Sequence, residues 1–252
     1  MHQASVGFHC PECTKRGAQK IVRPRDVLNQ RPVVTQVLMA INLVIFVLGI
    51  GPGLETKSQV VYGGGLIARA FNPYTQKVIG VAEGQWWRIV SSGFLHANIV
   101  HVGLNMWVLY SLGRLLEPAM GRLKFGLAYM VAMIGGGLGV MLIQPSSLTV
   151  GASGAVFGLM GVAAVMFSSR GVSLLSSGLG AMIALNLAFT FANQSEISVG
   201  GHIGGLLTGV LVGWILEQAG PRWIKDDTVT IVATAAVGVV LFGAAVMAAG
   251  AA

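Results

Sequence analysis

Residues 151–160 read GASGAVFGLM, a run of small and apolar residues with glycine at positions 151, 154 and 158. Small residues at such spacings are typical of membrane helices that pack closely against one another. The same stretch also places Ser153 in bare, glycine-flanked backbone, as a serine nucleophile requires. The remaining sequence has to decide whether Ser153 is a packing residue or a reacting one.

The composition is that of a membrane protein. Of 252 residues, 54% are hydrophobic and 10% are charged, whereas soluble domains carry about 25% charged residues. Apolar runs of about 20 residues cross a bilayer as helices, and the runs here are continuous rather than alternating. We therefore predict an all-α, polytopic helical membrane protein embedded in the lipid bilayer of the cell membrane.

Seven apolar runs predict seven spans. They cover residues 33–50, 99–117, 123–143, 152–167, 172–192, 199–217 and 228–249. A polar and amphipathic first loop at 51–98 follows the first span. We expect a basic tail at 1–32, a six-span core at 33–219, and a loop with an extra C-terminal span at 220–252. The sequence leaves the oligomeric state open.

The net charge of +7 is distributed between the spans rather than on one binding face, so it does not indicate a nucleic-acid partner. If the N-terminus is cytoplasmic, 12 of the 16 lysines and arginines fall on the cytoplasmic side. The positive-inside rule therefore predicts a cytoplasmic N-terminus and an outer C-terminus.

The tail contains Cys10 and Cys13 in the tetrapeptide CPEC. A structural zinc site needs four ligands, so this pair supplies half of one. The alternatives are two reduced thiols, a remnant of a larger zinc module, or a zinc site completed by tail histidines. We expect no metal site and no cofactor.

Four polar side chains fall at one depth in three different spans. His101 and Asn105 lie in HVGLNMW, Ser153 opens the fourth span, and His202 lies in SVGGHIGG. In the predicted orientation these spans run in the same direction, which places all four groups within about two helical turns of the outer surface. Polar groups in the hydrocarbon region are costly and usually functional or paired.

Two glycine stripes allow the fourth and sixth spans to be approached closely by another helix. The stripes are Gly154, Gly158 and Gly161 in one span and Gly201, Gly205, Gly209 and Gly213 in the other. If they face each other, Ser153 and His202 come within hydrogen-bond reach, the arrangement of a nucleophile and its base. No aspartate or glutamate lies at this depth, so we expect a dyad without a carboxylate.

Acyl transfer also needs donors for the developing oxyanion. The Asn105 amide, a ring N–H of His101 and the backbone N–H at the start of the Ser153 helix are the candidates. Gly151 and Gly154 keep side chains away from this position.

Together these residues resemble the rhomboid intramembrane serine proteases over about residues 33–219. The matching pieces are Trp87-Arg88, FLHANIVHVGLN with His96, His101 and Asn105, GRLLE ending in Glu117, GASG with Ser153, and GHIGG with His202. The resemblance implies that Ser153 is the nucleophile, that His202 is the general base, and that His101 and Asn105 line the oxyanion hole. It also implies structural roles for Trp87, Arg88 and Glu117. The seventh span is similar to the extra span of the six-plus-one variety of the family. The tail VGFHCPEC resembles the end of a cysteine-rich zinc module found before some actinobacterial rhomboids.

Further expectations complete this interpretation. His96 is expected to be structural or to organise water, and Glu117 to form an ion-pair cluster with Arg114 and Arg122. Substrates are expected to be single-span transmembrane proteins. The rival interpretation is a non-catalytic relative that binds transmembrane clients, whereas a transporter or channel would need a polar path through the whole bilayer.

Overall fold

The computed structural model describes residues 2–3, 8–9, 31–219 and 227–252, and the chain divides into the units Met1–Arg31 and Pro32–Ala252. In the first unit, β1 (His2–Gln3) pairs antiparallel with β2 (Phe8–His9). Cys10, Cys13 and most of the basic tail lie outside the described residues. Within the described ranges, no group of three or more His, Cys, Asp or Glu gathers as a metal site.

The second unit is a bundle of apolar helices, which confirms the polytopic helical fold. Its long helices are α3 (Val33–Gly49), α6 (Ile99–Met120), α7 (Arg122–Ile143), α8 (Ser153–Ser169), α9 (Leu179–Ala192), α10 (Val199–Trp214) and α12 (Asp227–Ala251). A π-helical turn, η4 (Ile215–Ala219), extends α10. By length and composition, α6, α7, α12 and the extended α10 can each cross a membrane, while α3, α8 and α9 are shorter apolar helices.

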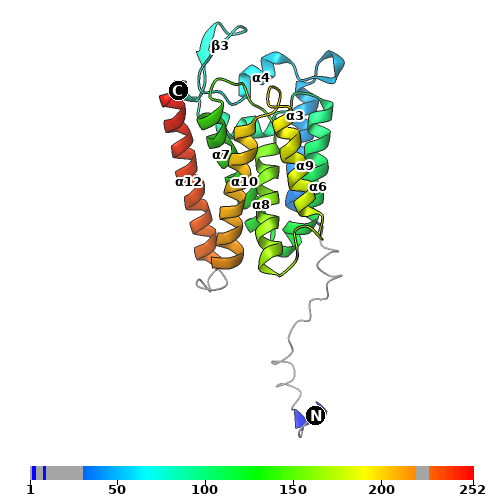
Figure 1. The fold of residues 1–252 in the computed structure, drawn as a ribbon. Helices are drawn as coiled ribbons and strands as arrows, with labels where there is room; N and C mark the ends of the chain where they lie inside the picture. The colour runs from blue at the N-terminus through cyan, green and yellow to red at the C-terminus, as the bar shows by residue number, and fades with distance from the viewer. Residues whose placement is uncertain (1, 4–7, 10–30, 220–226) are drawn as a thin grey trace. The chain divides into compact units, whose positions relative to one another are not determined.

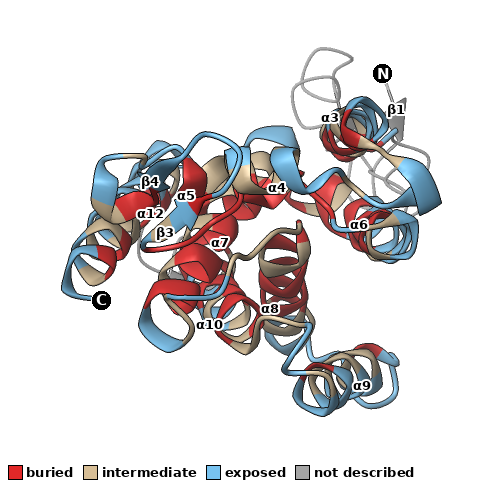
Figure 2. Ribbon diagram, turned by 90° about the horizontal axis from the view of Figure 1, so that it is seen from above, coloured by how far each residue is buried: buried red, intermediate tan, exposed pale blue. Residues whose placement is uncertain are grey.

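The direction of the helices brings three N-termini together. Helices α6, α8 and α10 run opposite to α3, α7, α9 and α12, so they begin at the end of the bundle that the first loop covers (Figure 1). Helix α10 packs mainly against α7 and α8, and α12 packs on α7. Seen from above, α9 lies at the edge of the bundle, and its residues are mostly exposed or only partly buried (Figure 2).

The glycine stripes of α8 and α10 face each other, which meets the condition that the sequence left open. A Cβ atom on Gly205 would collide with the carbonyl of Gly154, and one on Gly209 would collide with the carbonyl of Gly158. A Cβ on Gly161 would lie 2.5 Å from the carbonyl oxygen of Leu206. The two backbones are therefore in direct contact along several turns, which only small residues permit.

The first loop is more structured than its polarity suggests. It contains η1 (Pro52–Leu54), α4 (Ser58–Gly64), the unpredicted hairpin of β3 (Ala70–Asn72) and β4 (Lys77–Ile79), η2 (Val81–Glu83), α5 (Arg88–Ser91) and η3 (Ser92–Phe94). The Asn72 side chain forms the hairpin turn by accepting hydrogen bonds from the N–H groups of Tyr74 and Thr75. Such Asx turns end one strand and start the next.

The first loop is joined to the segment that precedes α8. Leu66 and Thr149 exchange backbone hydrogen bonds of 2.9 and 2.8 Å, and the Gly151 N–H donates to the Ser92 carbonyl at 2.9 Å. These bonds hold the backbone just before Ser153 against the loop.

The fifth span is shorter than predicted. Helix α9 begins at Leu179 rather than near residue 172, after Gly178 with a positive φ of 77°. The hydroxyl of Ser176 donates to the Ser173 carbonyl, and that of Ser177 donates to the Leu174 carbonyl. Serine side chains that bond nearby backbone compete with helix formation, and glycine readily adopts the left-handed conformation found here.

Glu117 does not form the expected ion-pair cluster with Arg114 and Arg122. Its carboxylate instead accepts hydrogen bonds from the backbone N–H groups of Val34 and Thr35 and from the Thr35 hydroxyl, each at 2.8 Å. The first N–H groups of a helix lack partners within it, and a helix N-terminus attracts negative charge. Glu117 therefore caps α3 from α6.

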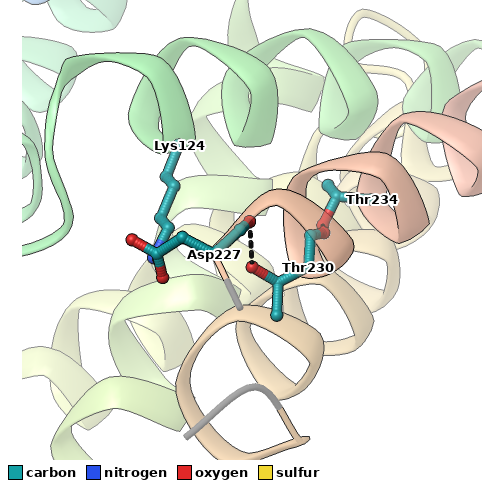
Figure 3. A network of polar contacts seen from close by, with 4 residues as sticks. All are labelled: Lys124, Asp227, Thr230 and Thr234. Carbon is teal, nitrogen blue, oxygen red and sulfur yellow. Dashed lines mark hydrogen bonds and ion pairs between the residues drawn. The ribbon is translucent and has the colours of Figure 1, made fainter. Parts of the chain in front are cut away.

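One ion pair joins the start of α12 to α7, and two threonine hydrogen bonds lie within α12 beside it (Figure 3). Lys124 Nζ lies 2.7 Å from Asp227 Oδ1, and the Thr230 hydroxyl donates to the Asp227 carbonyl at 2.8 Å. One turn further, the Thr234 hydroxyl donates to the Thr230 carbonyl at 2.8 Å. Because the Asp227 side chain is largely exposed, this pair contributes at most about 1 kcal/mol, and apolar packing holds α12.

Candidate active site

A cavity of about 800 Å³ opens where α6, α8 and α10 begin, and its lining includes His101, Asn105, Ser153 and His202. The structure thus brings the four predicted side chains to one cavity from three helices. Each lies within the first two turns of its helix, at the end covered by the first loop. The four side chains lie together because α6, α8 and α10 all begin at this end of the bundle.

Ser153 is the first residue of α8, and the backbone around it is shaped by glycine. Gly151 has a φ of 132°, a conformation that residues with a side chain rarely adopt. A Cβ at this position would lie 2.7 Å from His101 Nε2 and 3.6 Å from Ser153 Oγ. Glycine at 151 therefore keeps open the space that the His101 ring and the Ser153 hydroxyl share.

His202 is held against α8 by an aromatic contact. Its ring stacks on Phe157, with centroids 4.1 Å apart and planes 17° from parallel. Phe157 follows Ser153 by four residues and so lies on the same face of α8. The hydrogen bond of the His202 ring goes to Thr190 Oγ1, at 2.7 Å from Nδ1, rather than to Ser153. Catalytic hydrogen bonds often tighten only when substrate binds.

Two hydrogen-bond donors remain available on α6. The His101 Nδ1 accepts a long hydrogen bond of 3.5 Å from the Ala97 N–H, so the ring proton belongs on Nε2, beside Gly151. One amide hydrogen of Asn105 goes to the His101 carbonyl at 2.9 Å, and the NH₂ group keeps a second hydrogen. The Asn98 side chain accepts from the His101 N–H at 2.9 Å and caps this helix.

His96 supports the residue that precedes Ser153. Its Nε2 accepts a hydrogen bond of 3.4 Å from the Ala152 N–H, and its ring packs edge-to-face on His101 with centroids 5.1 Å apart. Burial, with a smaller contribution from His101, lowers the pKa of His96 to about 3. The ring is therefore a neutral acceptor at physiological pH, which favours a structural role.

Arg88 and Trp87 lie outside the cavity lining and differ in burial. The buried Arg88 guanidinium donates to the carbonyls of Gly65 and Tyr62 and to the Gln85 side chain, at 2.6 to 3.0 Å. It thereby ties the end of α4 to α5 within the first loop, and burial lowers its pKa. Trp87 is exposed on the loop surface.

Two residues of this site were not predicted from the sequence. Phe157 could have been found from its position one turn after Ser153, because an aromatic ring there covers the same face. Thr190 carries no comparable signal, since a lone threonine in an apolar helix most often bonds its own backbone.

The arrangement contains the groups that acyl transfer needs. The Ser153 hydroxyl lies at the N-terminus of α8, and the His202 imidazole stacks on Phe157 one turn further along that helix. The two N–H donors, His101 and Asn105, come from α6. Donors of this kind stabilise a developing oxyanion in a site that excludes bulk water.

Comparison with known proteins places this arrangement in a family context. A family model described as Rhomboid domain matches residues 83–219. The chain is 31% identical over 220 residues to the rhomboid protease GluP of Bacillus subtilis, a match that covers 85% of this chain and 41% of that protein.

Two further relatives match shorter parts of this chain. The putative rhomboid protease YdcA of Bacillus subtilis is 35% identical over 149 residues, which cover 57% of this chain and 74% of YdcA. RHOMBOID-like protein 4 of Arabidopsis thaliana is 34% identical over 148 residues, which cover 56% of this chain and 36% of that protein. The chain therefore spans less than half the length of GluP and of RHOMBOID-like protein 4.

Proposed function

The chain belongs to the rhomboid family, and from this premise we propose that it is an intramembrane serine endopeptidase. The observation that carries the proposal is that Ser153, His202, His101 and Asn105 all line the same cavity. Ser153 and His202 act as a dyad, and the mechanism uses protein groups alone.

The reaction proceeds through an acyl-enzyme. Ser153 Oγ attacks the carbonyl carbon of the scissile peptide bond while a ring nitrogen of His202 accepts its proton. The negative charge on the former carbonyl oxygen is stabilised by the ring N–H of His101, the Asn105 amide and the Ser153 backbone N–H. His202 then protonates the leaving amine as the C–N bond breaks, and water hydrolyses the Ser153 ester with His202 again accepting a proton.

Substrates are single-span transmembrane proteins cut near the outer face of the membrane. The carbonyls of a helix are hidden in hydrogen bonds between residues four apart, so the segment must unwind before Ser153 can attack. Small or helix-weakening residues near the cut lower the cost of this unwinding.

The orientation follows the charge bias, with the N-terminus in the cytoplasm and the C-terminus outside the cell membrane. Helix α3 begins and α12 ends at opposite ends of the bundle, as this topology requires (Figure 1). The cavity then opens toward the outer face.

The alternative is a non-catalytic relative that holds transmembrane clients in the same cavity. Such a protein needs the groove but no activated serine. The presence of both Ser153 and His202 on one cavity favours the protease.

Covalent labelling distinguishes the two functions. A fluorophosphonate should label the purified wild-type protein, and labelling should be lost in Ser153→Ala and strongly slowed in His202→Ala. Ser195→Ala is the matched control because Ser195 lines the same cavity from the segment before α10. Labelling that persists in Ser153→Ala would contradict the proposed nucleophile.

A further inference from the structure

The hydroxyl of Thr190 contacts the base of the proposed dyad from a separate helix. Thr190 lies near the end of α9, has no exposed surface, and places Oγ1 2.7 Å from His202 Nδ1. A threonine at this position is not part of the nucleophile, the base or the oxyanion donors. Its contact with Nδ1 bears on which ring nitrogen of His202 carries the proton.

The positions of the hydrogen atoms follow from a count of donors and acceptors. The Thr190 Oγ1 also lies 2.7 Å from the Asn186 carbonyl, which can only accept. Threonine has one hydroxyl proton, so both contacts are hydrogen bonds only if that proton goes to Asn186 and His202 Nδ1–H donates to Oγ1. The opposite tautomer would satisfy one contact and leave the other without a hydrogen.

This tautomer is the one that proton transfer from Ser153 needs. In a neutral imidazole with the proton on Nδ1, Nε2 is the ring's acceptor. Phe157 fixes the plane of the same ring by stacking, while Thr190 fixes its rotation within that plane. In serine proteases with a triad, a carboxylate does this second task, and a hydroxyl can do it without placing a charge in the bilayer.

We propose that Thr190 is a positioning residue that holds His202 in the Nδ1–H tautomer and so keeps Nε2 ready to accept the proton of Ser153. This inference rests on the proposed protease function. It also links the base to α9, a helix whose other faces carry the exposed side chains of Leu185, Phe189 and Phe191.

The test uses three variants of the 252-residue chain in lipid. Thr190→Val removes the hydroxyl and keeps the shape, and Thr190→Ser restores the hydroxyl. Thr234→Val is the matched control. Thr234 is as buried as Thr190, and its hydroxyl donates at 2.8 Å to the carbonyl four residues earlier, but both residues of that bond lie on α12 (Figure 3).

Kinetics on a model transmembrane substrate provide the first readout. We expect Thr190→Val to lower kcat by about tenfold with KM little changed, because a fixed base contributes to proton transfer rather than binding. Thr190→Ser should recover most of the lost kcat, and Thr234→Val should match the wild type. A wild-type kcat in Thr190→Val would overturn the proposal.

Nitrogen-15 NMR of labelled histidine rings provides a readout that does not need activity. The His202 signals are assigned by their loss in His202→Ala. We expect Nδ1–H in the wild type and in Thr190→Ser, and a mixture of tautomers in Thr190→Val. A wild-type ring protonated on Nε2 would overturn the proposal, including where Thr190→Val fails to fold. A wild-type protein that neither cleaves substrate nor reacts with a fluorophosphonate would contradict the proposed protease function. The NMR measurement of the His202 tautomer would still test the role of Thr190 in that case.

Discussion

Gly205 of α10 lies against the backbone of Gly154 in α8 so closely that a Cβ atom on Gly205 would overlap the Gly154 carbonyl. Gly154 directly follows the proposed nucleophile, Ser153, in α8, and Gly205 lies one turn after the proposed base, His202, in α10. The contact therefore joins a packing feature to a chemical one, because the distance between two helix axes sets the distance between Ser153 and His202.

Gly205→Ala should separate α8 from α10 and reduce both stability and cleavage. Forcing extra atoms into a packed interior costs about 1–3 kcal/mol. Here the alanine Cβ would collide with backbone atoms of Gly154, which cannot change rotamer as a side chain can. The measurements are the thermal midpoint in detergent and the rate of substrate cleavage.

Gly243→Ala on α12 is the matched control for this substitution. Nothing lies within 4 Å of a Cβ built on Gly243, so alanine there should preserve stability and activity. A Gly205→Ala protein with the wild-type midpoint and rate would show that the α8–α10 contact is looser than the structure has it.

Glu117→Ala should destabilise the start of α3. Substitution removes the acceptor of the buried Thr35 N–H and of the partly buried Val34 N–H, and a buried group left unsatisfied costs about 1–3 kcal/mol. A loss of that size should lower the thermal midpoint by roughly 5 °C.

The control for Glu117 is Glu83→Ala, which removes an exposed carboxylate paired with Arg69 at 2.8 Å. Exposed pairs contribute about 0–1 kcal/mol, so its midpoint should stay near the wild type. Equal effects of the two substitutions would refute the capping role of Glu117.

His96 should make stability depend on pH. Its folded pKa of about 3 lies below the ordinary value of 6.5, so the unfolded chain binds the proton more readily. The contribution of the neutral, buried His96 to the free energy of unfolding is therefore complete above about pH 6.5 and is lost progressively as the pH falls toward 3.

The measurement compares thermal midpoints of the wild type and His96→Gln between pH 7 and pH 4. Glutamine supplies an acceptor for the Ala152 N–H but does not titrate. The difference between the two proteins should shrink as the pH falls, and parallel pH curves would contradict a neutral, buried His96.

Much of this site can be predicted from periodicity and depth. The glycine spacing allows the close contact of α8 with α10, and the shared direction of α6, α8 and α10 predicts the common depth of the four polar side chains, because both depend on regular helix geometry. The role of Glu117 cannot be predicted this way, since its partners are backbone N–H groups 82 and 83 residues distant.

The other features that the sequence did not predict are the β3–β4 hairpin, the late start of α9 and the role of Thr190. The hairpin depends on an Asx turn at Asn72 within a segment that lacks strand alternation, and the late start of α9 depends on serine side chains that compete with helix bonds. Thr190 was missed because only the tertiary structure shows that its hydroxyl faces His202.

The central claim is that Ser153 and His202 cleave peptide bonds inside the membrane. The most direct test reconstitutes the wild type, Ser153→Ala and His202→Ala with a single-span model substrate and measures product by gel and mass spectrometry. We predict one cut site near the outer end of the substrate for the wild type and no product for either variant. Cleavage that persists in Ser153→Ala, or that is unaffected by His202→Ala, would contradict the account.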